Sequence, residues 1–310
     1  MFGGKKVIVL AWSPIGYEIY LTLRSMLPSE DVILISARNF NPPEAHSSLG
    51  INHHFFSQSE EQVKDVCLGL EKTVTHAAGL SGEFILFVPQ MGNFYARSMI
   101  ESDLCRRFFI YDEGSAAYGL AFIERYKKIW MRQNVRASDG LANLYSSCKV
   151  EYKKMSSLYK AGVKFYELDH PKLDGLVSFF PDAFPGFEKI QVPIAPVEPT
   201  KVEAAILVLL PPIRLFKENK NYIKYYSERL LSIGGRADTS IVLKPHPGEK
   251  EVPLDSYMKL LGIREATSYS SFAKSFDISP YREVAFMGFK SILSYGNSTE
   301  LYIDQLSKLN

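Results

Sequence analysis

Short apolar runs alternate with segments of helical periodicity along the first half of the chain. The apolar runs predict β-strands at residues 6–11, 31–36, 83–88, 107–111 and 164–168. Apolar residues at helical spacing predict helices over residues 15–27, 60–78, 115–132 and 139–159. Strands that alternate with helices in this way indicate βαβ units and a parallel sheet.

A proline-rich stretch at residues 181–201 interrupts this alternation, and we expect it to be a linker. Beyond it, apolar runs predict strands at residues 204–210, 240–244 and 290–295, and helical spacing predicts helices over residues 221–231, 280–287 and 298–309. The predicted fold class is therefore α/β, with two Rossmann-like doubly wound domains at residues 1–190 and 191–310. In such sheets, ligands bind outside the carboxyl ends of the strands.

The composition of the chain argues against several classes of function. The 310 residues suffice for two domains, and the net charge of +2 argues against a dedicated nucleic-acid binder. Three widely spaced cysteines, Cys67, Cys105 and Cys148, favour neither a disulfide framework nor a zinc site and fit a reducing cytoplasm. No apolar run reaches membrane-spanning length, so we expect a cytoplasmic protein whose membrane association would be peripheral, at the inner face of the cell membrane.

An acidic motif, Asp112-Glu113-Gly114, follows the predicted strand at 107–111. A carboxylate at a strand end can accept the proton of an attacking hydroxyl, and Gly114 would let the backbone turn sharply. The alternative is an ordinary N-cap, in which Asp112 or Glu113 caps a helix that begins near Ser115.

A histidine held between two prolines follows the predicted strand at 240–244, in the segment Lys244-Pro245-His246-Pro247. The prolines fix the backbone on both sides, so a cationic His246 could stabilise a departing phosphate. The alternative is a proline-rich turn with a solvent-facing histidine. A second pair, His170-Pro171, shows that the dipeptide alone is weak evidence, and we expect His170 to lie in a turn near the linker.

Hydroxyl residues open the last predicted helix, in the segment Asn297-Ser298-Thr299 after the strand at 290–295. Hydroxyls and free backbone amides at a helix start form an anion site, and the alternative is an N-cap at Asn297 or Ser298. Upstream, the Glu283 carboxylate could accept hydrogen bonds from ribose hydroxyls, although a solvated helix residue would look the same. The sequence has no metal-ligand cluster, no Gly-x-Gly-x-x-Gly and no P-loop, which disfavours metal-dependent, dinucleotide and NTP chemistry.

Taken in chain order, these motifs resemble those of bacterial sialyltransferases of the GT-B type. That family has an (Asp/Glu)-(Asp/Glu)-Gly motif in its N-terminal domain, and a His-Pro motif and a Ser/Thr pair in its C-terminal domain. The chain has Asp-Glu-Gly at 112–114, His-Pro at 246–247 and Ser-Thr at 298–299, with a Pro-x-x-Glu at 280–283. The group includes lipooligosaccharide and capsular sialyltransferases and polysialyltransferases. Two doubly wound domains joined by a linker are also the GT-B layout.

The resemblance implies a role for each motif. Asp112 would be the general base, His246 would assist departure of the CMP phosphate, and Glu283 would hold the ribose. Ser298 and Thr299 would hold the phosphate, with Thr299 standing where the family often has serine. Further candidates in the same motifs are Glu113, Gly114, Pro247 and Asn297. The family inverts configuration and needs no metal or other cofactor.

The resulting hypothesis is an inverting, metal-independent transfer of sialic acid from CMP-sialic acid to a hydroxyl of a surface oligosaccharide or capsule. The expected partners are a nucleotide-sugar donor and a glycan acceptor, with no nucleic acid. Two alternatives stay open. One is a GT-B transferase for another CMP-activated sugar acid such as Kdo, and the other is a noncatalytic protein that binds nucleotide or carbohydrate. The sequence does not select the acceptor, the linkage or the oligomeric state, nor a membrane or acceptor role for the basic run at 125–136.

Overall fold

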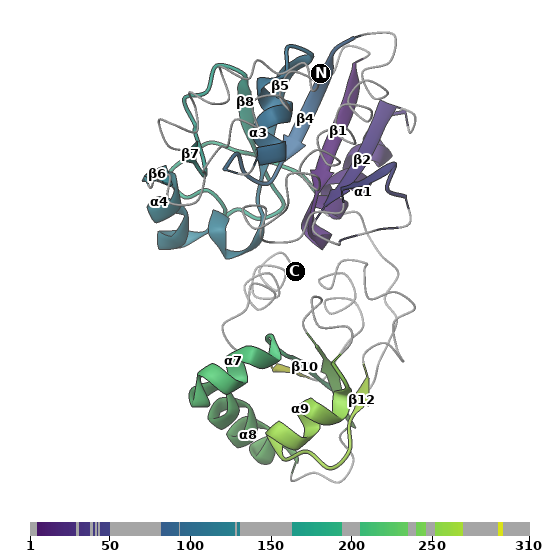
Figure 1. Ribbon diagram of the computed structural model, residues 1–310, viewed down its shortest axis with the longest axis vertical. Coiled ribbons are helices and arrows are strands. Elements are labelled where there is room, and N and C mark those ends of the chain that lie inside the picture. Colours follow the sequence, from purple (N-terminus) through teal and green to yellow (C-terminus); the bar gives the residue numbers. More distant parts are fainter. Residues whose placement is uncertain are drawn as a thin grey trace, which may run out of the picture. The chain divides into compact units, whose positions relative to one another are not determined.

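Two parallel β-sheets organise the chain, one in each of two units, Met1–Ala195 and Pro196–Asn310 (Figure 1). The computed structural model describes residues 5–28, 31–37, 40, 42, 44–49, 82–92, 94–127, 129–130, 163–193, 205–234, 240–245, 252–268 and 291–293. The first unit extends past residue 190, where the sequence predicted the domain boundary, because a short strand at 190–191 joins its sheet.

The sheet of the first unit has the strand order β3-β2-β1-β4-β5-β8-β9, and its pairings are parallel. Its strands are β1 (Lys6–Ala11), β2 (Val32–Ala37), β3 (Ser47–Leu49), β4 (Phe84–Val88), β5 (Cys105–Tyr111), β8 (Leu173–Ser178) and β9 (Ile190–Gln191). The order runs outward from β1 in both directions, as in a doubly wound Rossmann sheet, so it reverses between β1 and β4.

Continuous apolar runs form the central strands because both faces of a parallel sheet are covered. Val7 to Leu10 of β1 and Phe84 to Leu86 of β4 have no exposed surface. Helix α1 (Pro14–Met26) follows β1, with Pro14 in its first turn, where the missing amide costs no hydrogen bond. Helix α3 (Phe94–Glu101) connects β4 to β5.

A short helical segment connects β5 to β8. The 3-10 turn η4 (Gly114–Ala117) is followed by α4 (Gly119–Lys127) and by an antiparallel pair, β6 (Ile129–Trp130) with β7 (Val163–Lys164). Gly119, the first residue of α4, has a φ of 51°, in the left-handed region that glycine adopts without a Cβ clash. This change of direction ends η4 after one turn.

The sheet of the second unit has the order β12-β11-β10-β13 and is also parallel in its pairings. Its strands are β10 (Ala205–Leu209), β11 (Ser240–Lys244), β12 (Thr267–Ser268) and β13 (Ser291–Leu293). Numbered within its own sheet this is the order 3-2-1-4, which matches the first four strands of the doubly wound order in the first unit and includes its reversal.

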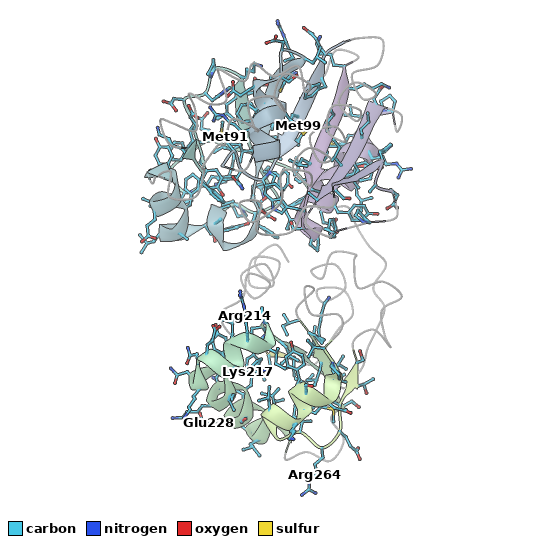
Figure 2. All side chains as sticks on the ribbon, in the orientation of Figure 1. Met91, Met99, Arg214, Lys217, Glu228 and Arg264 are labelled. Atoms are coloured by element: carbon cyan, nitrogen blue, oxygen red, sulfur yellow. The ribbon has the colours of Figure 1, made fainter. Side chains whose placement is uncertain are left out.

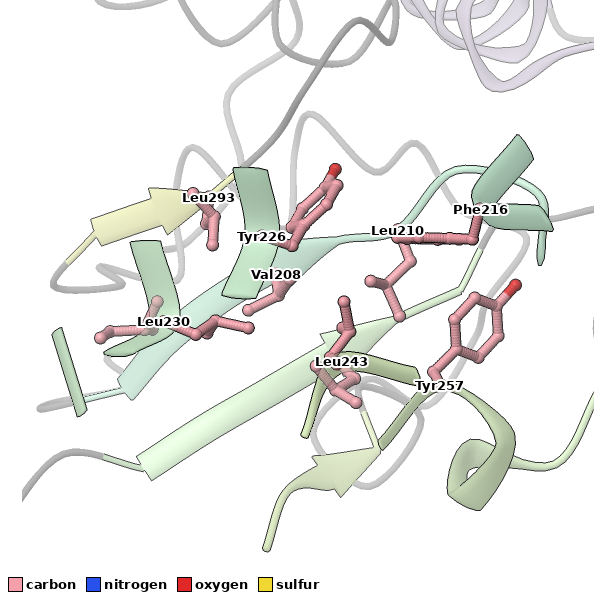
Figure 3. Packing of buried hydrophobic residues seen from close by; sticks show 10 residues of the cluster. Val208, Leu210, Phe216, Tyr226, Leu230, Leu243, Tyr257 and Leu293 are labelled. Atoms are coloured by element: carbon pink, nitrogen blue, oxygen red, sulfur yellow. The ribbon is translucent and has the colours of Figure 1, made fainter. Parts of the chain in front are cut away.

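One face of this second sheet carries the core shown in Figure 3. Val208 and Leu210 pack there against Tyr226 and Leu230, and the core also includes Phe216, Leu243, Tyr257 and Leu293. Phe216 comes from α7 (Ile213–Glu218), Tyr226 and Leu230 come from α8 (Lys220–Gly234), and Tyr257 comes from α9 (Leu254–Leu261). Arg214 and Lys217 of α7 and Glu228 of α8, which are labelled in Figure 2, are exposed.

The predicted α/β fold class with two doubly wound parallel sheets is confirmed. In the first unit, strands are present where they were predicted at residues 6–11 (β1), 31–36 (β2), 83–88 (β4) and 107–111 (β5). In the second unit, the same holds for the strands predicted at 204–210 (β10), 240–244 (β11) and 290–295 (β13). The predicted helices at 15–27 and 221–231 correspond to α1 and α8. Helices predicted at 60–78, 139–159, 280–287 and 298–309 lie outside the described residues.

Three predictions between residues 115 and 201 were wrong. The helix predicted at 115–132 is broken at Gly119 and ends at Lys127. The strand predicted at 164–168 is two residues long, and the sheet strand is β8, which begins at Leu173. Residues 181–193 are not a linker, since Ala183 and Phe184 are fully buried and β9 pairs with β8.

Among the described residues, none of the helices has the length and apolar character that crossing a membrane requires.

Candidate functional site

Asp112 lies at the carboxyl end of β5, immediately after Tyr111. Its backbone amide donates to the Val177 carbonyl at 3.0 Å, so the pairing of β5 with β8 continues for one residue past the strand. The carboxyl ends of β4, β5 and β8 share this edge because the three strands are parallel neighbours. The structure therefore places Asp112 at the edge where doubly wound sheets bind ligands.

The Asp112 carboxyl group is enclosed by protein and has no exposed surface. The Tyr118 hydroxyl donates to its Oδ2 at 2.5 Å. Its Oδ1 is buried and accepts no well-aligned hydrogen bond from the described residues. An N-cap carboxylate accepts amides from the first turn of its own helix, whereas the Oδ2 partner here is a side-chain hydroxyl beyond the 3-10 turn.

Burial raises the pKa of Asp112 to about 6, because the charged form loses its hydration. The Tyr118 hydroxyl, the backbone amides of Phe179 and Asp112 and the Ser178 hydroxyl act in the opposite direction. The Ser178 hydroxyl contributes weakly, since its proton is donated to the Phe180 carbonyl at 2.8 Å. A carboxyl group with a pKa near 6 is mostly ionised at neutral pH and still basic enough to accept a proton.

The segment that follows Asp112, from η4 to Tyr118, is fixed to the loop that follows β8. Tyr118 pairs with Ala183 in an isolated antiparallel bridge, and the Phe184 amide donates to the Ala117 carbonyl at 2.7 Å. Phe184 is fully buried and adopts a φ of 50°, which is unfavourable for a bulky side chain. Such a conformation persists only where surrounding contacts impose it, so this loop is held firmly against η4.

The other two residues of the acidic motif are less informative. Glu113 is partly buried, and Gly114 is the first residue of η4. In this segment, the left-handed backbone conformation occurs at Gly119.

The second sheet brings the strands that precede the His-Pro and Ser-Thr motifs to one edge. Strand β10 pairs with β11 on one side and with β13 on the other, all in parallel. Adjacent strands lie about 4.8 Å apart, so the ends of β11 and β13 are separated by about 10 Å. His246 follows β11 by two residues, and Ser298 follows β13 by five. His246, Pro247, Glu283, Asn297, Ser298 and Thr299 themselves lie outside the described residues.

Lys244, the last residue of β11, is a candidate that the sequence analysis did not select. It is only 4% exposed although it carries an ammonium group, and such groups are almost never fully buried unless an anion or hydrogen-bond acceptor accompanies them. Its place at the carboxyl edge of the second sheet, two residues before His246, adds a cation to the segment where the sequence predicts a phosphate site. A single charge that ends an otherwise apolar strand was the available signal in the sequence.

His170 belongs to a different part of the first unit from Asp112. It lies in the turn before β8, at the amino end of the strand, whereas Asp112 lies at the carboxyl edge. Its Nδ1 accepts the Lys172 amide at 3.1 Å, so its proton is on Nε2, which faces Glu101 Oε1 at 3.3 Å. The predicted turn is confirmed, and His170 is buried within it at the amino end of β8.

Glu101 also pairs with Arg97, whose guanidinium lies 2.8 Å from its Oε1 and 2.6 Å from Glu167 Oε2. Arg97 and Glu101 are both almost completely buried. His170 is therefore part of a buried ionic cluster that joins α3 to the turn before β8. No group of three or more histidine, cysteine, aspartate or glutamate side chains within the described ranges is arranged to hold a metal ion.

Comparison with known proteins yields similarity to solved structures alone. No protein-family model matches the sequence, and no curated protein matches it significantly. One similar structure is the spinosyn rhamnosyltransferase SpnG, with a TM-score of 0.42 and 10% identity over 97% of this chain and 78% of that chain. A second is WaaG, a glycosyltransferase involved in lipopolysaccharide biosynthesis, with a TM-score of 0.37 and 11% identity over 97% and 90% of the two chains.

A third is a UDP-N-acetylglucosamine 2-epimerase from Rickettsia bellii, with a TM-score of 0.33 and 12% identity over 86% of this chain and 70% of that one. At these scores and identities, the similarities do not fix a function. The α/β assignment depends on the strand order of the chain's own two sheets.

Proposed function

We propose that the protein is a GT-B glycosyltransferase, and specifically an inverting, metal-independent sialyltransferase that uses CMP-sialic acid. The observation that carries the proposal is the buried carboxyl group of Asp112, at the carboxyl edge of a doubly wound sheet and with a pKa raised to about 6. A general base that works near neutral pH needs a pKa in this range. The specific donor follows from the resemblance of the three motifs to bacterial sialyltransferases.

In the proposed reaction, an acceptor sugar hydroxyl gives its proton to Asp112. Its oxygen attacks the anomeric carbon of the donor as the bond from that carbon to the CMP phosphate oxygen breaks. The electron pair of the broken bond leaves with CMP, and attack from the opposite face inverts the configuration. His246, Ser298 and Thr299 stabilise the departing phosphate, and Glu283 holds the ribose. Most of the rate enhancement comes from positioning and from charge stabilisation.

Two features of the second unit support the donor side of this proposal. The strands before the His-Pro and Ser-Thr motifs flank β10 at the same sheet edge, as a shared phosphate site requires. The buried Lys244 ammonium belongs to the same edge.

Because Asp112 has no exposed surface, access of an acceptor hydroxyl requires side chains around Oδ1 to shift.

The direct test is release of CMP from CMP-Neu5Ac and, in parallel, from CMP-Kdo, with truncated lipooligosaccharide and capsular oligosaccharides as acceptors. Acceptor-dependent release from CMP-Neu5Ac alone supports the proposal, and release from CMP-Kdo alone assigns the other CMP-sugar acid. Calorimetric binding of CMP without turnover of either donor would contradict an enzymatic role. The Asp112→Asn variant should lose transfer at least 100-fold and still bind CMP, whereas normal turnover in that variant would exclude Asp112 as the base.

A further inference from the structure

The Tyr118 hydroxyl is the group that the structure adds to the acidic motif. It donates to Oδ2 of Asp112 at 2.5 Å, and both side chains are buried. We propose that Tyr118 is a positioning residue for the general base: its hydrogen bond fixes Oδ2 and leaves Oδ1 as the oxygen that receives the acceptor's proton. This inference rests on the proposed function, because it assigns a role in the same proton transfer.

The two carboxylate oxygens have different surroundings. Oδ2 accepts a hydrogen bond from a phenol, which is a strong donor to an anion. Oδ1 accepts no well-aligned hydrogen bond from the described residues, although it is buried. An ionised carboxylate has lone pairs on both oxygens, so the oxygen with fewer donors is the more basic one. Tyr118 therefore determines which oxygen acts as the base.

Tyr118 itself is rigidly held, as a positioning residue must be. It is 6% exposed, and its backbone is fixed on two sides. It pairs with Ala183 in the antiparallel bridge, and its carbonyl accepts the Phe122 amide at 3.2 Å as α4 begins. Gly119, the first residue of α4, follows Tyr118 directly and has a left-handed backbone with a φ of 51°.

The same hydrogen bond sets the charge state of the base. Groups that act on the Asp112 carboxyl are the Tyr118 hydroxyl, the backbone amides of Phe179 and Asp112 and the Ser178 hydroxyl. Each favours the ionised carboxylate and so offsets part of the cost of burial. Removal of the hydroxyl should therefore make Asp112 harder to ionise and orient it less well.

The experiment compares Tyr118→Phe with Tyr111→Phe in the full chain. Tyr111 is the matched control because it is also buried and its hydroxyl also makes a hydrogen bond, at 2.8 Å, but to the Leu10 carbonyl. In the pH profile of kcat/KM for CMP release, Tyr118→Phe should move the acid limb upward by about one pH unit. Its kcat should fall about 10- to 100-fold at unchanged donor KM. Tyr111→Phe should leave the acid limb where it is.

A second readout does not need turnover. The Asp112 carboxyl carbon, identified in ¹³C NMR spectra by its loss in Asp112→Asn, should titrate at a higher pH in Tyr118→Phe than in the wild type. An unchanged acid limb and titration midpoint in an active Tyr118→Phe variant would overturn this inference and leave the proposed function intact. Absence of transfer by the wild type with every donor would instead overturn the proposed function and, with it, the catalytic role of Tyr118.

Discussion

Gly16 and Tyr111 touch across the face of the first sheet. A Cβ added to Gly16 would lie 2.5 Å from the Tyr111 hydroxyl oxygen and 2.7 Å from the Cβ of Ala11. Real Cβ atoms do not approach other atoms so closely, so α1 lies on the sheet at a distance that only glycine permits. Tyr111 directly precedes Asp112 in the sequence.

The Gly16→Ala variant should be destabilised by about 1 to 3 kcal/mol, because the added methyl group forces α1 away from β1 and β5. Urea denaturation measures the change. Gly175→Ala is the control: its added Cβ would meet ordinary contacts, the nearest at 3.6 Å to Phe109. That variant should have stability within about 0.5 kcal/mol of the wild type. Equal stability of Gly16→Ala and the wild type would show that the contact relaxes freely.

Stability should depend on pH through Asp112. Its pKa is raised from 3.8 to about 6 in the folded state, so the folded protein holds this proton more tightly than the unfolded chain. The stabilisation from the bound proton is complete below about pH 3.8 and is lost as the pH rises through about 6. An Asp112→Asn variant does not titrate here and should gain about 2 kcal/mol relative to the wild type between pH 4 and pH 7.

Unfolding of both proteins by urea at several pH values tests this expectation. A stability difference that stays constant from pH 4 to pH 7 would mean that the Asp112 carboxyl ionises as readily in the folded protein as in the unfolded chain.

The two histidine-proline pairs should respond to substitution in opposite ways. His170→Ala should lower the free energy of unfolding by about 1 to 3 kcal/mol, because the Lys172 amide and the buried Glu101 carboxylate lose a partner. Its affinity for CMP should be unchanged. His246→Ala should weaken CMP binding or slow CMP release and should leave the urea midpoint of the protein in place.

Calorimetry with CMP and urea titration of both variants separate the two roles. Weakened CMP binding in His170→Ala at unchanged stability would reverse the assignment of the two pairs.

Lys244→Met should weaken CMP binding about tenfold with little change in stability. Methionine has a similar length, and a buried charge can often be replaced by an apolar group of similar volume at little cost. The control is Lys224→Met on α8, where the lysine is exposed and lies 3.9 Å from Glu228. Unchanged CMP affinity in Lys244→Met would remove this ammonium group from the donor site.

The strands that the sequence predicted are those with uninterrupted apolar runs. Residues of β1, β4 and β10 are buried along their whole length or nearly so, and their pattern is visible without tertiary information. Strand β8 was missed because its first half carries Asp174 and Gly175 and only its second half is buried. Helix α3 was missed because the charged residues Arg97 and Glu101 interrupt its apolar face. Their ion pair is what allows this face to be buried.

The position of Asp112 could be predicted, but its surroundings could not. A strand followed by acidic residues is readable in a sequence. Burial of the carboxyl group depends on the contact of Tyr118 with Ala183, which lies 65 residues further along the chain. Prolines at 181 and 185 suggested a linker, whereas the neighbouring Phe180 and Phe184 are fully buried in the first unit.

All seven strands of the first sheet precede Pro196 in the sequence. A ribosome adds about 5 to 20 residues per second, so synthesis of the second unit takes about 6 to 20 s after the first is complete. Domains of this kind fold within seconds or less. The first sheet, which carries Asp112, can therefore assume its native form on the ribosome while most of the second unit is still to be synthesised.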